Sequence, residues 1–186
     1  MGVQILLVVL GIIIILGIWV AVSYNGFISI KNRVEEAFAT MDVYLKKRYD
    51  LIPNLVETVK GYAAHESETL TKVIQARNLA SGAASIEDKQ RLEGDFANTL
   101  KSLFAVVESY PNLKADSQFL SLQAQLTEIE GEIANSRKYY NAIVNNFNTK
   151  CETFPSVILA GIFGFKEKPY FEVDEAAERK NVKIEF

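Results

Sequence analysis

The chain has 186 residues, of which 49% are hydrophobic and 23% charged, which suits one globular domain with an additional apolar segment. Its formal net charge of −3 provides no basic field, so we expect no nucleic-acid partner. One cysteine excludes a disulfide framework or a cysteine-rich zinc site, and one histidine excludes most metal and triad chemistry.

The first predicted element is a membrane-spanning helix. Residues 5–22 form an unbroken apolar run, and every charged side chain of the protein lies at Lys31 or beyond. About 20 apolar residues in helical geometry span the ~30 Å hydrocarbon core of a bilayer. Aromatic rings at the end of such a run prefer the level of the lipid headgroups. The residues that represent the predicted membrane anchor are Ile5, Leu10, Ile15, Trp19 and Tyr24.

A cleaved signal peptide is the alternative for this run, since Ala21-Val22-Ser23 is a passable cleavage site. The residues before the run carry no basic side chain, and the run is longer than a signal-peptide core, so we expect a retained anchor. Lys31 and Arg33 follow the run closely, and basic residues favour the cytoplasmic side. We therefore expect a single-pass protein of the cell membrane that contacts lipid through this helix and has its domain in the cytoplasm.

Beyond the anchor, apolar residues recur at steps of three and four, the repeat of amphipathic helices. Pro53 disfavours helical geometry in the residue before it but suits a first helical turn. The sequence therefore predicts one helix that ends near Tyr49 and a second that begins there. Ser85 is placed to cap a third helix, and Asp116 or Ser117 to cap a fourth. The second predicted helix stops at Ser81-Gly82, the third ends at Tyr110-Pro111-Asn112, and Pro155 bounds the fourth.

Four amphipathic helices joined by short loops predict an all-α fold, with the membrane helix leading into an antiparallel up-down four-helix bundle and a short C-terminal tail. A long parallel coiled coil is the alternative, and the short connections argue against it. Leu126, Ile129 and Ile133 lie on one stripe of the fourth helix, so we expect all three to be buried. Residues 182–186 could add a short extended piece. The predicted parts are a transmembrane anchor (1–23), the bundle (24–153), an apolar membrane-proximal segment (154–171) and a charged tail (172–186).

One long segment carries a family resemblance. Residues 42–66, which read DVYLKKRYDLIPNLVETVKGYAAHE, look like the signature segment of the LemA family. Shorter stretches around Arg77, Tyr110, Arg137 and Pro155 fall where that family has similar residues. The resemblance implies one membrane helix and an antiparallel helical domain. It also implies bacterial membrane and envelope contexts, including membrane stress and magnetosome membranes, and it supplies no catalytic residues.

The residues themselves favour no enzyme. His65 and Glu66 begin like the H-E-x-x-H zinc motif, but Thr69 stands where the second histidine ligand is needed. A di-iron site in a helical bundle needs a Glu-x-x-His motif on two helices, which one histidine cannot supply. Cys151 lies on the apolar stripe of the fourth helix and is expected to fill the core. We therefore expect no catalytic site, no metal and no cofactor.

Two places are candidate interaction surfaces, and the first is the predicted membrane-distal tip. There the turns at residues 48–53 and 110–114 would meet, and exposed Arg and Tyr side chains are favoured at protein interfaces. The alternative is ordinary turn chemistry with a solvated run of charges. The candidate partner-binding residues are Lys46, Lys47, Arg48, Tyr49, Asp50, Tyr110 and Asn112.

The second candidate surface is the apolar segment 154–165, which is too short to span a bilayer. An even number of antiparallel helices returns the chain to the membrane, so this segment should emerge beside the start of the first helix. We expect it to contact lipid or the first turns beyond Val22. The competing interpretation is that it folds back as a cap on the core of the bundle. The candidate interfacial residues are Phe154, Ile158, Phe163 and Phe165.

These patterns predict a LemA-like single-pass membrane protein that acts as a non-catalytic interaction or scaffold module at the bacterial envelope. Other envelope proteins are the expected partners, and a homo-oligomer stays open. The alternative is a lipid-contacting protein that shapes the bilayer or monitors membrane stress. An enzyme is the third class, and no acid, base, nucleophile or metal constellation in the sequence supports it.

The anchor and its orientation can be tested together. We expect residues 3–22 to stay attached and Lys31 to lie on the cytoplasmic side. An impermeant thiol reagent should then fail to label cysteines introduced into the helical domain of intact cells, and should label them once the membrane is opened. Labelling in intact cells would contradict the orientation, and a mature N-terminus near Ser23 would contradict the anchor.

Overall fold

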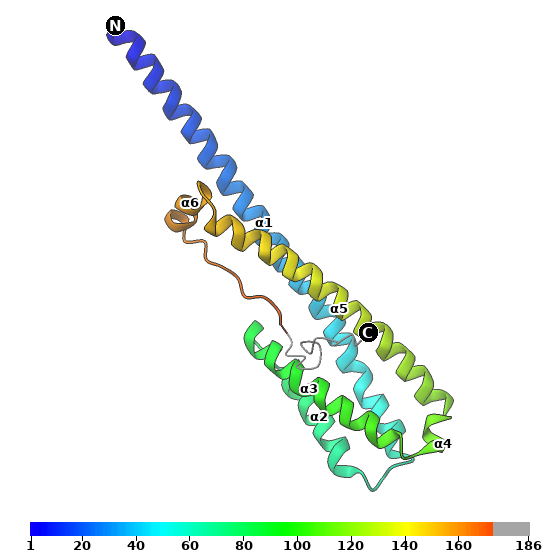
Figure 1. The fold of residues 1–186 in the computed structure, drawn as a ribbon. Coiled ribbons are helices and arrows are strands. Elements are labelled where there is room, and N and C mark those ends of the chain that lie inside the picture. The colour runs from blue at the N-terminus through cyan, green and yellow to red at the C-terminus, as the bar shows by residue number, and fades with distance from the viewer. Residues whose placement is uncertain (173–186) are drawn as a thin grey trace, which may run out of the picture. The chain divides into compact units, whose positions relative to one another are not determined.

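A computed structural model describes residues 1–172, and within them every regular element is a helix. The all-α class and the long apolar N-terminal helix are thereby confirmed (Figure 1). The extended piece expected at residues 182–186, and all but the first residue of the expected charged tail, lie outside the described residues. The helices are α1 (Gly2–Lys60), α2 (Ser67–Ser81), α3 (Ile86–Val107), α4 (Pro111–Lys114), α5 (Ser117–Glu152) and α6 (Ser156–Phe163).

The predicted break near Tyr49 is wrong, because α1 continues through Pro53 to Lys60. A proline inside a helix removes one backbone hydrogen bond and costs about 3 kcal/mol. Ile52 and Leu55 on either side of the proline are 0% and 2% exposed. Burying each such side chain contributes roughly 1.5–3 kcal/mol, and only a continued helix keeps both on the buried stripe. Burial therefore outweighs the cost of the proline.

The later helix starts follow the expected capping chemistry. The Ser85 hydroxyl accepts a hydrogen bond from the backbone N–H of Asp88 at 3.0 Å, and α3 begins at the next residue. The carboxylate of Asp116 accepts one from the backbone N–H of Phe119 at 2.8 Å, and α5 begins at Ser117. Both side chains satisfy backbone donors that the first helical turn leaves unpaired. These two predicted starts are confirmed.

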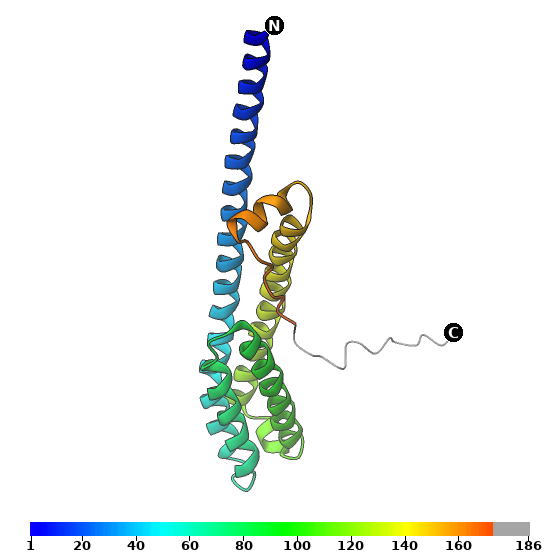
Figure 2. The same ribbon diagram turned by 90° about the vertical axis from the view of Figure 1, so that its left-hand side faces the viewer.

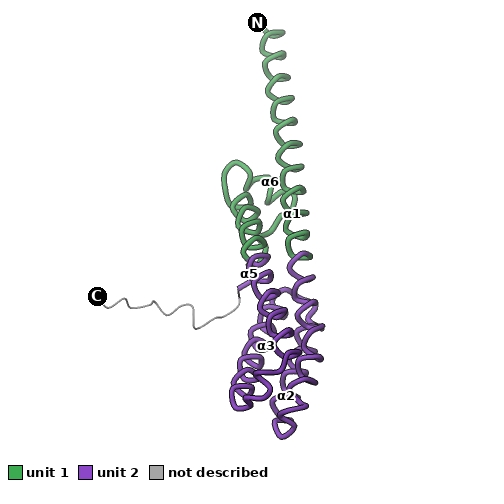
Figure 3. The backbone as a smooth tube through the Cα atoms, turned by 90° about the vertical axis from the view of Figure 1, so that its right-hand side faces the viewer, with its two compact units in different colours: residues 1–39, 138–170 green, residues 40–137, 171–186 purple. Residues whose placement is uncertain are grey.

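The chain forms two compact units (Figure 3). Unit 1 comprises residues 1–39 and 138–170, which are the first part of α1, the last part of α5, and α6. Unit 2 comprises residues 40–137 together with the described residues 171 and 172, and it includes α2, α3 and α4. α1 and α5 each supply residues to both units.

In unit 1, α1 and α5 pass each other in opposite directions. The rings of Phe27 and Phe147 are 6.2 Å apart, and the rings of Phe38 and Tyr140 are 5.8 Å apart, so residue numbers rise on one helix as they fall on the other. In the part of α1 before this contact, the large apolar side chains from Val3 to Ile18 are exposed. Among the described residues, α1 is the helix that is long and apolar enough to cross a membrane, by length and composition.

Unit 2 has its own apolar core, and α2 and α3 lie side by side in it (Figure 2). Leu126 and Ile133 on α5 are 5% and 6% exposed, so their predicted burial is confirmed. Ile129 is only half-buried, and its predicted burial is wrong. An α-helix turns by about 100° per residue, which places Ile133 roughly 20° from Leu126 around the helix but Ile129 roughly 60° away. Ile129 therefore lies at the edge of the buried stripe.

Truncation of the buried stripe should show this difference. We expect Leu126→Ala to lower the free energy of unfolding by about 2–5 kcal/mol, because it removes buried methyl groups and leaves a cavity. Leu120→Ala on the same helix is the matched control, since Leu120 is 48% exposed, and it should change stability by about 0.5 kcal/mol or less. Chemical denaturation followed by circular dichroism measures both, and equal losses would contradict the assigned face.

Candidate functional site

The segment after α5 is shaped by a bend and by a glycine. The Ser156 hydroxyl donates a hydrogen bond to the backbone carbonyl of Lys150 at 2.8 Å, which holds the bend between α5 and α6. α6 ends at Gly164, whose φ of 72° lies in the left-handed region that glycine adopts without steric cost. The backbone N–H of Phe165 then donates to the carbonyl of Ala160 at 2.9 Å, as is typical of helix C-termini.

An aromatic cluster ties the end of α6 to α1 within unit 1. Phe165 stacks on Phe27 with ring centroids 4.6 Å apart and an interplanar angle of 10°. Phe163 lies 4.9 Å from Tyr24, and Phe165 also meets Phe147 edge-on at 6.5 Å. Phe163 and Phe165 thus contact the first turns of α1 beyond the apolar run. Tyr24, expected among the anchor residues, lies in this cluster.

The opposite side of the same segment is exposed and apolar. Phe154 is 81% exposed, Ile162 69% and Ile158 52%, whereas Leu159 and Ala160 are buried. The two interpretations offered by the sequence therefore apply to different faces of α6. One face packs on the rest of unit 1, and the other leaves large apolar side chains uncovered by the described part of the chain.

Polar side chains at the end of α5 hold the chain that follows α6. The Asn148 amide accepts from the backbone N–H of Lys168 at 2.8 Å and donates to its carbonyl at 2.9 Å. The Tyr140 hydroxyl donates to the carbonyl of Pro169 at 2.9 Å, and Tyr170 donates to the side chain of Asn145 at 3.1 Å. This network fixes residues 168–170 against α5 and so keeps α6 in place from its C-terminal side.

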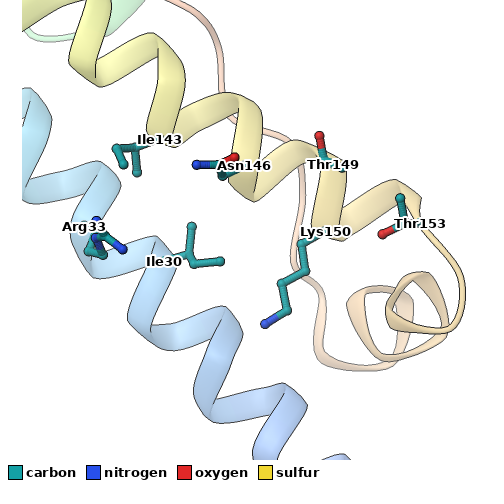
Figure 4. A pocket seen from close by; sticks show the side chains of 7 residues that line it. All are labelled: Ile30, Arg33, Ile143, Asn146, Thr149, Lys150 and Thr153. Atoms are coloured by element: carbon teal, nitrogen blue, oxygen red, sulfur yellow. The ribbon is translucent and has the colours of Figure 1, made fainter.

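A pocket of about 370 Å³ lies between α1 and α5 in unit 1 (Figure 4). The Lys150 ammonium reaches into it from α5 and lies 3.4 Å from the backbone carbonyl of Ser23 and 4.6 Å over the Phe27 ring. Partial burial lowers the pKa of Lys150 below the usual value for lysine. The sequence reasoning missed this pocket, because its two walls are more than one hundred residues apart in the chain.

The predicted membrane-distal tip needs correction. The turn expected at residues 48–53 lies inside α1, and Arg48 and Tyr49 are each 3% exposed. They are buried because they fall on the same side of the continuous helix as Leu45 and Ile52. Among the other candidates on α1, Lys46, Lys47 and Asp50 are exposed.

Arg48 instead forms a buried polar cluster in unit 2. Its guanidinium donates to Glu93 on α3 and to Glu130 on α5, the latter at 2.7 Å, and lies 5.0 Å over the Phe96 ring. The Tyr49 hydroxyl donates to the same Glu93 carboxylate. Glu93 is the residue that sequence reasoning missed. Its position one turn before Phe96 on the apolar stripe of α3 was the available signal.

Burial is the main cause that raises the pKa of Tyr49 to about 12. The negative charge of Asp42 adds to the increase, whereas the positive charges of Arg48 and Arg77 oppose it. The phenol therefore stays protonated at neutral pH and acts only as a hydrogen-bond donor to Glu93. The cluster thus joins α1 to α3 and α5 within unit 2.

The other part of the predicted tip, at residues 110–114, contacts a turn other than the one expected at residues 48–53. The Tyr110 hydroxyl donates to Glu66 at 3.3 Å, and the Tyr62 hydroxyl donates to Asp116 at 2.9 Å. The segment around α4 therefore contacts the turn at residues 61–66, which follows the actual end of α1. Asn112 is exposed on α4. Partner binding by the exposed residues of this region stays a prediction.

The side chains that could bind a metal or act as nucleophiles form no metal-binding group in the described part of the chain. Within residues 1–172, no three His, Cys, Asp or Glu side chains come together in a way that could hold a metal ion. Cys151 is buried, and burial raises the pKa of its thiol, which disfavours the reactive thiolate. Its predicted place in the core is confirmed. His65 is exposed.

The described residues form only helices, and one of these is a candidate membrane helix. Comparison with known sequences assigns the chain to a family. The sequence model of the LemA family matches residues 37–186, so the chain belongs to the LemA family. The resemblance carried by residues 42–66 is thereby confirmed.

Individual relatives give the same assignment. Magnetosome protein MamQ 2 of Paramagnetospirillum magneticum is 26% identical over 181 residues, covering 83% of this chain and 66% of the relative. Magnetosome protein MamQ of Magnetospirillum gryphiswaldense is 24% identical with the same coverage. Protein LemA of Metamycoplasma hominis is 27% identical over 135 residues, covering 70% of this chain and 60% of the relative. The chain thus spans about two thirds or less of the length of these relatives.

Removing the buried arginine should destabilise unit 2. We expect Arg48→Met to lower the free energy of unfolding by about 3–5 kcal/mol, because Glu93 then keeps a buried charge without its cation. Lys47→Met, at the exposed neighbouring position, should change stability by about 0.5 kcal/mol or less. The double variant Arg48→Met/Glu93→Met should regain most of the loss. Thermal and chemical melts measure all three, and no recovery in the double variant would contradict the ion-pair explanation.

Proposed function

We propose that this chain is a non-catalytic membrane module whose helical domain is attached to the bilayer twice, through α1 and through the exposed face of α6. Its architecture in this proposal is an up-down four-helix bundle. Asp42 and Arg48 on α1 pair with Lys89 and Glu93 on α3, so these two helices run in the same direction, as alternate helices of such a bundle do.

The exposed apolar face of α6 is the observation that carries the proposal. Phe154, Ile158 and Ile162 would each have to stay in water if nothing covered them, and apolar patches of this kind mark lipid or protein contacts. The aromatic cluster holds α6 beside the residues that directly follow the apolar run of α1. An apolar helix beside the foot of a membrane helix suits the boundary between headgroups and acyl chains, and exposed Lys166 can reach the headgroups.

The names of the relatives are compatible with an interaction role, and we propose one here. Two relatives are named magnetosome proteins and one is named LemA, and none of these names states an enzymatic activity. We propose that the bundle acts at the inner membrane of a bacterial envelope, on the cytoplasmic side, and offers its exposed surface to other envelope proteins. Crosslinking with mass spectrometry in the native cell tests this part. Recovery of the chain without any protein partner would contradict it.

Lipid contact by α6 has a direct test in the full chain. Cys151 is replaced by alanine, and a single cysteine at position 162 is labelled with an environment-sensitive fluorophore after reconstitution into lipid nanodiscs. We expect spin-labelled lipids to quench this probe strongly, because Ile162 faces the bilayer in the proposal. A probe at position 120 is the control, since Leu120 is also apolar and exposed but lies in unit 2. Equal weak quenching at both positions would contradict lipid contact by α6.

A further inference from the structure

The pocket between α1 and α5 has the chemistry of an anion site. Arg33 contributes from α1 and Lys150 from α5, and Asn146 and Thr149 add an amide and a hydroxyl that can donate hydrogen bonds (Figure 4). No carboxylate lines the pocket. Neither cation forms an ion pair with any residue between positions 1 and 172, so their positive charges are not neutralised by this part of the chain.

The Lys150 side chain lines the pocket, and its ammonium lies against α1. Its ammonium has three donors, and the carbonyl of Ser23 accepts one of them at the long distance of 3.4 Å. A Cβ atom at position 26 would collide with the ammonium, so Gly26 provides the space that it occupies on α1. The side chain thus lies against an aromatic ring and a glycine, with donors to spare for a ligand.

The ammonium lies at a defined level along α1. The carbonyl that it contacts belongs to Ser23, the residue directly after the apolar run 5–22. If that run fills the hydrocarbon core, Lys150 lies at its boundary, where lipid phosphates are found. Arg33 lies seven residues beyond Gly26 on the same helix, roughly 10 Å along its axis, and helical side chains lean back towards the N-terminus. Both cations can therefore reach a polar headgroup that is attached at this level.

We infer that this pocket binds the phosphate-ester headgroup of an anionic membrane lipid. The phosphate is bound by Lys150, and Arg33 with Asn146 receives the outer part of the headgroup. Phe154, which is 81% exposed, directly follows Thr153, which lines the pocket. The inference rests on the proposed function only in that α1 spans the bilayer, and it does not require α6 to enter the lipid.

Lipid binding to the full chain in detergent micelles tests the inference. Native mass spectrometry compares dioleoyl phosphatidylglycerol with dioleoyl phosphatidylcholine, and we expect preferential binding of phosphatidylglycerol. Lys150→Gln and Arg33→Gln should each weaken that binding by a factor of roughly 10 to 150, since a hydrogen bond to a charged group is worth about 1.5–3 kcal/mol. Gly26→Ala should weaken it as well without changing any charge, because the new Cβ displaces the ammonium.

Matched variants separate the site from general attraction. Lys31→Gln removes the same charge from a neighbouring position on α1 that does not line the pocket, and Gly17→Ala adds a Cβ where nothing lies within 4 Å. Both should bind phosphatidylglycerol like the unaltered chain. The inference is overturned if Lys31→Gln is as weak as Lys150→Gln, or if Lys150→Gln binds normally. It is also overturned if millimolar inorganic phosphate displaces the lipid, which would assign the pocket to a soluble anion.

The two proposals fail in different ways. If spin-labelled lipids do not quench the probe at position 162, the proposed contact of α6 with the bilayer is contradicted. Preferential binding of the headgroup is still expected in that case. If the chain does not prefer phosphatidylglycerol but the probe at position 162 is still quenched, only the headgroup site is contradicted. Circular dichroism of each variant verifies that helix content is unchanged, which we expect because Arg33 is exposed and Lys150 is half-buried.

Discussion

The continuity of α1 is the constraint on which the rest of the structure depends. One helix is apolar on all sides over residues 5–22, and then, from Phe27 to Val59, keeps its buried apolar residues on a single stripe. That stripe meets Phe147 and Phe165 in unit 1 and Phe96 in unit 2. Within each unit, the unbroken helix places the packing residues of α1 on the same side.

Local sequence rules predicted those features of the fold that local chemistry decides. The long apolar helix and the caps at Ser85 and Asp116 each depend on a few adjacent residues, and these were predicted correctly. The end of the first helix was not. A proline has a fixed local cost, whereas the gain from burying Ile52 and Leu55 depends on helices that lie far along the chain. The role of Arg48 was not predicted either, because its partner Glu93 is 45 residues away in the chain.

The apolar segment after α5 shows why the sequence allowed two incompatible interpretations. A short helix has two faces, and composition alone does not say which residues share a face with the core. Leu159 and Ala160 turn inwards while Ile158 and Ile162 turn outwards, and glycine at position 164 lets the chain bring Phe165 back onto Phe27. The aromatic residues therefore fix the helix, and the aliphatic residues on its other side remain exposed.

Lys150 illustrates the same limit for the candidate site. In the sequence it is a basic residue in the last turn of a helix, a place where the helix dipole favours a cation and where no further role is needed. Only the pairing of α5 with α1 sets its ammonium against Gly26 and Phe27. There the ammonium is partly desolvated, which lowers the pKa of Lys150 and makes its charged form more costly than in water. An anion at the same place reverses that cost, so an occupied pocket should stabilise the contact between α1 and α5 in unit 1.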